Sequence, residues 1–461
     1  MRPLTLTPLV LALILGACAV GPAYQVPATP EPVAFKEAAG WVAAAPADTL
    51  ERGPWWTLFE DPVLNALAAQ VEVSNQNVAA AVASYAQARA LVQEQRASLF
   101  PSVGLTISGD RSGGRNVEVE NSFRANIGAS WEPDIWGRLR AGVTSAGASA
   151  QASEADLAAA RLSAQGELAI NYFSLREADA AHALLLTTIE GYERVQKITR
   201  NRFEAGIAGK SDVLQAETQL ANARVDELTL VRQRAQLEHA IAILVGKAPA
   251  DFTLAPADWR ANVPDIPVGV PSVLLQRRPD IASAERRVAA ANAQIGIARS
   301  AYYPNIGLSG SVSSGASRLG DLFSASNLLW SVGSSVAQSL FNAGATRASV
   351  AGAEAQHQAT VARYRQTVLD AFGDVENQLS ATRILAQQQT LRQQASLAAD
   401  QAEAQMLNRY KAGQVSYTEV VQAQATALSA RRALVQLQAD RQTTAVALIQ
   451  SLGGGWQASV K

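Results

Sequence analysis

The sequence is poor in cysteine, in net charge and in long apolar runs, and each shortage excludes a class of protein. Cys18 is the only cysteine among 461 residues, so the chain has no internal disulfide. Lysine plus arginine (39) nearly balance aspartate plus glutamate (40), which leaves no basic excess for nucleic acid. After the N-terminal segment no run approaches the roughly 20 apolar residues of a membrane-spanning helix. If the mature chain crosses a membrane, it does so as strands.

Histidine is also scarce, and no catalytic or metal-binding constellation is present. His182, His239 and His357 are isolated, and none has a second histidine or a cysteine at ligand spacing. The glycine run at residues 453–455 lacks the Lys-Ser and the helix that follow a phosphate-binding loop. We therefore predict that the protein is not an enzyme and carries no cofactor or metal, apart from a lipid on Cys18.

That lipid is predicted from the N-terminal pattern. Arg2 is followed by a mostly apolar segment, residues 4–15, and then by small residues before Cys18. About a dozen apolar residues are too few to span a bilayer. We expect residues 1–17 to be a signal peptide and residues 18–60 an N-terminal extension acylated at Cys18; an unmodified cysteine is the alternative. No aspartate follows Cys18, which favours sorting to a bacterial outer membrane.

Two halves of the chain have similar sequences. The segment RFEAGIAGKSDVLQA, which begins at Arg202, returns as RYKAGQVSYTEVVQA at Arg409. A repeat separated by so many residues indicates a duplicated half-protein rather than short solenoid units. We assign the first copy to residues 61–250 and the second to residues 279–452, and expect each to contain a helix, two strands and a long helical hairpin.

In each copy, two segments alternate between apolar residues and serine or glycine. The expected strands are residues 102–112, 122–132, 304–314 and 328–338. This period of two, over about ten residues, is typical of membrane strands with one face toward water. Two ordinary hairpins with one buried face are the alternative. Four strands cannot close a barrel and lipid tolerates no open edge, so a spanning barrel requires several chains, and a conduit favours three.

Proline is absent between Pro133 and Pro249, where good helix formers predominate. A helix from about Arg138 to Phe203 would be near 100 Å long. The helix that returns from it has a heptad seam: Val213, Ala216, Leu220, Ala223, Glu227, Leu230, Arg234, Leu237, Ile241 and Leu244. A second, weaker stripe lies beside the seam: Leu214, Thr218, Ala221, Val225, Leu228, Ala235 and Ala242. Helices with two stripes contact a neighbour on each side and can close into a tube; a solid bundle is the alternative.

The long helices are expected to reverse direction at Gly206 and Gly413. Glycine fits a helix end that needs positive φ. Ser211 with Asp212, and Ser416, are the candidate caps of the returning helices. A helical hairpin without any partner would have the same sequence features.

Five motifs, in order along the chain, resemble those of the outer-membrane factor family of TolC-like efflux ducts, and especially its OprM-like and NodT-like lipoprotein branch. They are CAVGPAYQVP from Cys18, WTLFEDPVLN from Trp56, WEPDIWGR from Trp131, RRPDIASAE from Arg277 and FNAG from Phe341. One such motif would be a weak signal. Five in the same order over the whole mature chain make a specific one.

The resemblance implies a mainly α fold with some β structure, assembled as a homotrimer. Long antiparallel helical hairpins would form a trimeric α-barrel tunnel, and four strands per chain would contribute to a twelve-stranded transmembrane β-barrel. Residues 251–278 and 453–461 would lie in an equatorial region. The implied function is the passive exit duct of a tripartite efflux system, as in multidrug resistance, fed by an RND-type inner-membrane pump through a periplasmic adaptor. One-step protein secretion and a coiled-coil lipoprotein without a pore are the alternatives.

The resemblance also assigns site residues. The hairpin tips that would contact the adaptor are Gly206, Ile207 and Ala208, and Gly413, Gln414 and Val415. The periplasmic gate would lie at Tyr417, Thr418, Glu419 and Gln422. Related ducts often have a carboxylate at the position aligned with Gln422, whose amide is neutral. Because Glu419 is the nearest acid, about one helical turn earlier, it would have to provide any cation-binding constriction.

Overall fold

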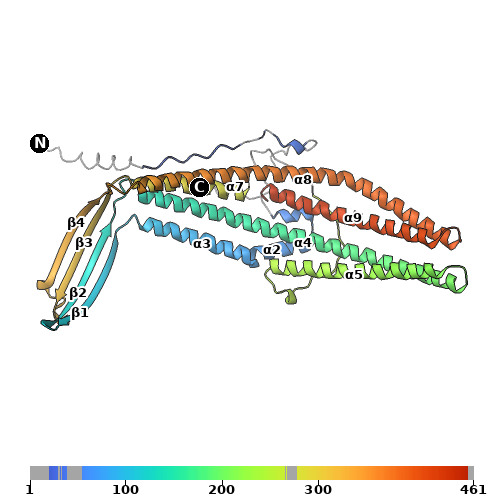
Figure 1. The fold of residues 1–461 in the computed structure, drawn as a ribbon, viewed down its shortest axis with the longest axis horizontal. Helices are drawn as coiled ribbons and strands as arrows, with labels where there is room; N and C mark the ends of the chain where they lie inside the picture. The colour runs from blue at the N-terminus through green and yellow to red at the C-terminus, as the bar shows by residue number, and fades with distance from the viewer. Residues whose placement is uncertain are drawn as a thin grey trace. The chain divides into compact units, whose positions relative to one another are not determined.

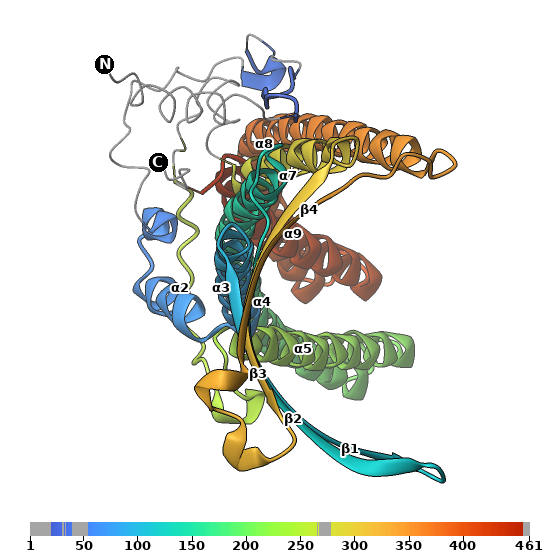
Figure 2. The ribbon, with the colours of Figure 1, turned by 90° about the vertical axis from the view of Figure 1, so that its left-hand side faces the viewer.

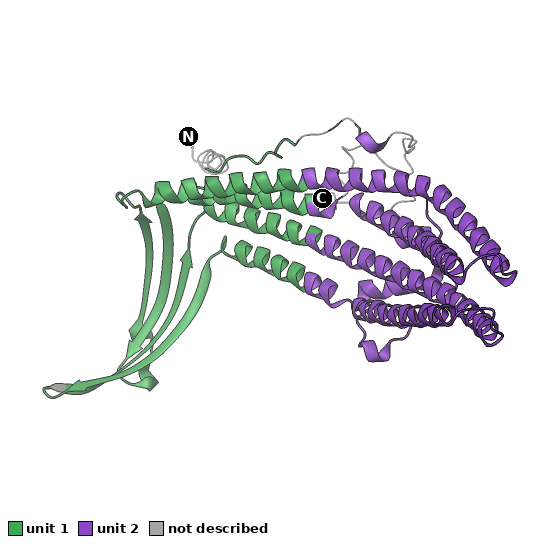
Figure 3. Ribbon diagram, turned by 45° about the vertical axis from the view of Figure 1, so that its right-hand side comes forward, with its two compact units in different colours: residues 1–29, 83–155, 281–367 green, residues 30–82, 156–280, 368–461 purple. Residues whose placement is uncertain are grey.

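The computed structural model describes most of the chain. The described residues are 20–29, 32, 34–38, 54–264, 266 and 278–454. Cys18 and the predicted signal peptide lie outside them, as do residues 267–277 of the predicted linker and residues 455–461. The chain forms two compact units, each with residues from both copies of the repeat (Figure 3). Unit 1 contains residues 83–155 and 281–367 with part of residues 1–29; unit 2 contains residues 156–280 and 368–461 with part of residues 30–82.

Each copy supplies a helix, two strands, a very long helix and a return helix (Figure 1). The first copy has α3 (Gln76–Ala97), β1 (Ser102–Gly114), β2 (Val117–Trp131), α4 (Arg138–Glu204) and α5 (Lys210–Leu244), preceded by α2 (Pro62–Ser74). The second has α7 (Pro279–Ser300), β3 (Asn305–Ala316), β4 (Leu328–Ala337), α8 (Ala345–Lys411) and α9 (Tyr417–Ser451). The mainly helical fold with an internal repeat is therefore confirmed, and α4 and α8 each have 67 residues.

The four strands form one antiparallel sheet in the order β1-β2-β3-β4, which follows a curved arc (Figure 2). The register aligns Leu105 with Ile127, Ile127 with Val312, and Val312 with Trp330, so one apolar row crosses all four strands. Ala125 and Ser314 on this face are buried, but its large apolar side chains are uncovered, with exposed fractions up to 80% at Val332. Serine, threonine and asparagine lie on the opposite face: Ser102, Thr106, Asn126, Ser130, Ser309, Ser311 and Ser331.

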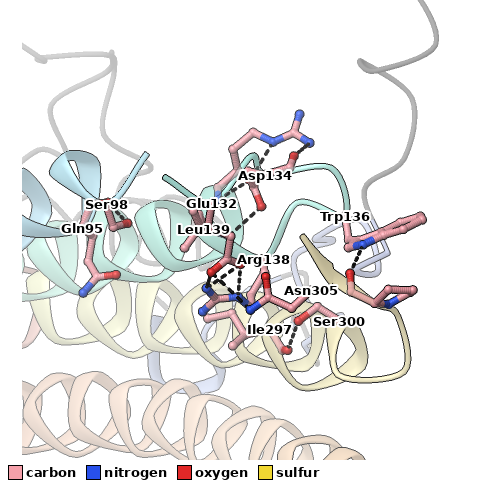
Figure 4. Close-up of polar contacts among 12 residues, drawn as sticks. Gln95, Ser98, Glu132, Asp134, Trp136, Arg138, Leu139, Ile297, Ser300 and Asn305 are labelled. Carbon is pink, nitrogen blue, oxygen red and sulfur yellow. Dashed lines mark hydrogen bonds and ion pairs between the residues drawn. The ribbon is translucent and has the colours of Figure 1, made fainter. Parts of the chain in front are cut away.

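The WEPDIWGR motif, residues 131–138, connects β2 to the start of α4 through side-chain contacts (Figure 4). The Asp134 carboxylate accepts from the backbone N–H groups of Leu139 and Arg140 at 2.9 Å each, and so caps the helix. Arg138 donates to both oxygens of Glu132 at 2.8 Å. Gly137 has a φ of 79°, which glycine adopts without strain. These contacts fix the direction in which α4 leaves β2.

Most of the predicted heptad seam of α5 is buried, whereas its members Glu227, Arg234 and Leu237 are half-buried. Its buried residues include Val213, Ala216, Leu220, Ala223, Leu230, Ile241 and Leu244. Leu220, Ala223 and Leu230 pack with Leu185 and Tyr192 of α4 in one apolar cluster. The second stripe differs, because its larger side chains stay uncovered within one chain: Leu214 (52% exposed), Val225 (61%) and Leu228 (68%).

A buried ionic group fastens the segment after α5 to the helices of unit 2. Asp179 accepts from Arg176 at 2.9 Å and from Arg234 at 2.7 Å. Arg176 also donates to the Ala255 carbonyl at 3.0 Å, and Arg234 to the Leu254 carbonyl. Glu238 pairs with Arg234 at 3.5 Å and balances the second guanidinium group. Removing Asp179 would therefore leave an uncompensated buried positive charge.

None of the helices among the described residues combines the length and the apolar character that crossing a membrane requires.

Candidate functional site

Both helical hairpins turn through the same backbone motif. At the end of α4, the Gly206 N–H donates to the Phe203 carbonyl at 2.9 Å, and the Ile207 N–H reaches the Arg202 carbonyl at 2.8 Å. This is the Schellman pattern, which places the glycine in the left-handed region. Gly206 has a φ of 73°, and Gly413 repeats the pattern with a φ of 75°. The positive φ expected at both turns is present.

The predicted tip residues lie at the surface of unit 2. Gly206, Gly413 and Gln414 are exposed, and Ile207 leaves 66% of its surface uncovered. Ala208 is half-buried. Val415, also half-buried, packs against the apolar cluster beneath the second turn. Ile207 is therefore the largest apolar side chain that the two turns present outward.

Of the predicted caps of the returning helices, Ser211 with Asp212 is wrong, and Ser416 has the expected position without the expected hydrogen bond. Ser211 and Asp212 lie inside the first turn of α5, because the helix begins one residue after Gly209, which caps it without a side-chain hydrogen bond. Ser416 is at the N-cap of α9, but its hydroxyl bonds no backbone N–H of that helix. It contacts the Glu419 carboxylate instead, at 3.4 Å.

The predicted gate residues differ in burial. Tyr417 is 2% exposed, and its ring lies 5.4 Å from that of Tyr410, centroid to centroid. Burial raises the pKa of Tyr417 to about 12, so its hydroxyl stays neutral. Thr418 is exposed and contacts Gln215 of α5 at 3.4 Å. Glu419 and Gln422 are both exposed on α9, so both side chains can meet solvent or another chain.

Sequence reasoning missed the contact that joins the two hairpins. One guanidinium nitrogen of Arg202 donates to the carbonyls of Tyr410 and Lys411 at 3.2 and 3.3 Å. The guanidinium carbon also lies 4.8 Å from the centre of the Tyr410 ring. Arg202 therefore caps the end of α8 with a charged donor and a cation–π contact. The recurrence of Arg202 as Arg409 in the repeated segment is the sequence feature that could have indicated a structural role.

The chemistry of the described residues is that of packing and hydrogen bonding. They contain no group of three or more histidine, cysteine, aspartate or glutamate side chains able to hold a metal ion. His182 faces the Glu227 carboxylate at 3.6 Å, as a single histidine beside a single acid. The features that distinguish the chain are thus two surfaces: the exposed apolar face of the sheet, and the joined hairpin tips.

The two copies match, one after the other, the profile of a known family. Residues 67–247 and 270–454 match the family described as "Outer membrane efflux protein". The chain belongs to the outer membrane efflux protein family. The two matched segments coincide with the two halves of the repeat.

Individual members of this family align along nearly the whole chain. The toluene efflux pump outer membrane protein TtgC of Pseudomonas putida is 32% identical, over 97% of this chain and 94% of its own length. The cation efflux system protein CusC of Escherichia coli is 30% identical, over 99% and 100%. The solved structure of the outer-membrane channel OprN is 32% identical and covers 95% of this chain and 100% of its own, with a TM-score of 0.86.

These findings confirm the predicted family, fold and role as an efflux protein of the outer membrane. The family is one of efflux proteins rather than enzymes. The assigned tip and gate residues, and the lipid on Cys18, stay predictions.

Removing the Arg202 cap tests whether it stabilises the second hairpin. Arg202→Ala leaves the carbonyls of Tyr410 and Lys411 without their charged donor, and a hydrogen bond to a charged group contributes about 1.5–3 kcal/mol. We expect hydrogen exchange at the amides of residues 412–415 to accelerate about tenfold or more. Arg200→Ala, which removes an exposed ion pair with Glu217, is the matched control. Equal acceleration in both variants would contradict a specific cap.

Proposed function

We propose that the chain is one of three identical protomers of an outer-membrane exit duct. The duct passively conducts substrates that an inner-membrane pump of the RND type delivers through a periplasmic adaptor. The observation that carries this proposal is the sheet: four strands with one exposed apolar face, one polar face and two open edges. The names of the relatives, which refer to efflux of toluene and of cations, agree with a conduit whose cargo is chosen elsewhere.

The open edges are the reason for proposing several copies. Among the described strands, β1 and β4 each pair on one side only, which leaves a row of backbone donors and acceptors unsatisfied in lipid. Pairing β1 of one protomer with β4 of the next closes the sheet, and three protomers give a barrel of about twelve strands with room for a lumen. The serine-rich face then lines water and the apolar face meets lipid.

A crosslink between the sheet edges tests the trimer. We propose Thr106→Cys in β1 together with Ser335→Cys in β4, treated with a bis-maleimide shorter than the roughly 14 Å between these strands within one sheet. Denaturing gels should show dimers and trimers and no larger species. Thr106→Cys alone is the control and should stay monomeric. Monomers only, or a ladder that continues past three, would refute the closed trimer.

The lipid anchor is proposed at Cys18. Val20, two residues later, donates its N–H to the Trp136 carbonyl at 3.4 Å. Trp136 lies between the end of β2 and the start of α4, and two residues of chain reach about 7 Å. Val20 is thus held next to the connection between the strands and α4, at the proposed inner surface of the membrane.

Cys18→Ser should abolish acylation, because the thiol is the acceptor. Cells grown with radioactive palmitate should label the wild-type protein and not the variant. An unlabelled wild-type protein would disprove the anchor, while the sheet-edge crosslink in the same cells would report separately on assembly.

The hairpin tips are proposed to contact the adaptor. The helix that ends at the first turn, α4, has 67 residues and is about 100 Å long. Gly206, Ile207 and Ala208 form this tip, and Gly413, Gln414 and Val415 form the second. The exposed Ile207 supplies the apolar contact that interfaces use as an anchor.

Ile207→Asp should weaken the adaptor contact without unfolding the chain, since the side chain is already exposed. We expect recovery of the adaptor with the purified duct to fall about tenfold, the effect of losing one interface anchor. Val73→Asp, at an exposed position of α2 (85%), is the matched control. Unchanged recovery with Ile207→Asp would exclude this tip from the contact.

Glu419 is proposed to provide the cation-binding constriction near the pore axis, with Thr418 and Gln422 beside it. Three carboxylates that approach one another attract cations strongly. Glu419→Gln should weaken block by a trivalent cation in planar bilayers about tenfold, and Gln422→Asp should strengthen it. If both variants conduct and block as the wild type does, Glu419 faces away from the pore.

A further inference from the structure

The internal repeat places a second arginine where Arg202 stands in the first hairpin. Arg409 occupies the equivalent position near the end of α8. Its side chain is exposed and has no hydrogen bond, ion pair or ring contact among the described residues. Within a single chain, the guanidinium group of Arg202 therefore caps a helix end, and that of the equivalent Arg409 does not.

The backbone carbonyls at the two helix ends differ in whether an arginine donates to them. Arg202 caps the carbonyls of Tyr410 and Lys411 at the end of α8 and covers the Tyr410 ring. Their counterparts at the end of α4 are Phe203 and Glu204. The Glu204 carbonyl receives no donor from the described part of the chain, and the Phe203 side chain is 41% exposed. One helix end thus has its charged donor, and the equivalent end lacks one.

The two return helices, α5 and α9, also differ in how much of the face near the turn is covered within the chain. In α9, Thr418 contacts Gln215 of α5, and Leu428 packs on the apolar cluster of the first hairpin. The residues of α5 equivalent to this face of α9 are exposed: Ser211, Leu214, Ala221 and Val225. Within a chain, the second hairpin is covered by the first, and the corresponding face of the first hairpin is uncovered.

We propose that Arg409 caps the end of α4 in a neighbouring copy of the chain, donating to the carbonyls of Phe203 and Glu204 there and covering the Phe203 ring. The inference rests on the proposed trimer. Because each copy offers a donor on one hairpin and an acceptor on the other, the contact is head-to-tail and closes in a ring. A trimer then has six arginine caps, three within chains and three between them.

The interface between the two hairpins of one chain differs from the proposed interface between hairpins of neighbouring chains. Within a chain, Arg432 of α9 forms an ion pair with Asp226 of α5 at 3.0 Å. In the repeat, Val225 corresponds to Arg432, and Ala433 corresponds to Asp226. The interface between chains therefore has two apolar residues at these positions and cannot form this ion pair. The contact between chains therefore depends more on the Arg409 cap.

Crosslinking tests the proximity. Arg409→Cys with Glu204→Cys, treated with a short bis-maleimide in the purified duct without adaptor, should give dimers and trimers. Arg202→Cys with Lys411→Cys, the pair within a chain, should react without raising the molecular mass. If the sheet-edge pair yields trimers and the Arg409–Glu204 pair yields monomers, the trimer stands and the cap is refuted. If neither pair links chains, the proposed trimer itself fails.

Hydrogen exchange tests the cap as distinct from mere closeness. In the trimer, Arg409→Ala should accelerate exchange about tenfold at the amides of residues 205–208, the end of the first hairpin, as expected for losing a charged hydrogen bond. Lys411→Ala, an exposed cation two residues away, should leave these amides unchanged. Unchanged exchange in Arg409→Ala would overturn the cap. So would exchange accelerated only when the adaptor is present, because the adaptor would then be what covers this face.

Discussion

The unpaired edges of the four-stranded sheet are the constraint on which the rest of the structure depends. In water, an open edge is a liability; in lipid, it leaves backbone groups with no partner of any kind. One chain meets the requirement for an apolar face but not for a closed hydrogen-bond ladder. The long helices are incomplete in the same way, since Leu214, Val225 and Leu228 of the second stripe of α5 are uncovered within one chain, although Ala242 is buried. Both parts of the protein are therefore fragments of a larger closed object.

Duplication explains how a single chain builds such a fragment. Each copy makes the same order of elements and the same glycine turn, and the family profile matches each copy separately. A contact evolved once between two hairpins is then available again between chains, with the donor on one hairpin and the acceptor on the other. The differences between the copies, such as Asp226 without an acidic counterpart at position 433, are what make the two interfaces distinguishable.

Features with a local cause could be predicted from the sequence, and features with a tertiary cause could not. The seam of α5 follows from heptad spacing, and the positive φ of Gly206 and Gly413 follows from turn chemistry. The break between α2 and α3 was missed, because Asn75 ends one helix by capping the next and donating to the Leu244 carbonyl at 2.8 Å. Tyr417 was assigned to the gate because the resemblance gives the position, but burial depends on which helices meet there.

The Arg202 contact has a consequence for how such proteins diverge. Its hydrogen-bond acceptors are main-chain carbonyls, which every amino acid carries. Substitutions at the end of α8 therefore change the ring beneath the guanidinium but leave the acceptors in place. Selection that preserves these hydrogen bonds therefore acts on Arg202 alone. In homologous proteins the residues around the turn can change while the arginine at this one position keeps the two hairpins in contact.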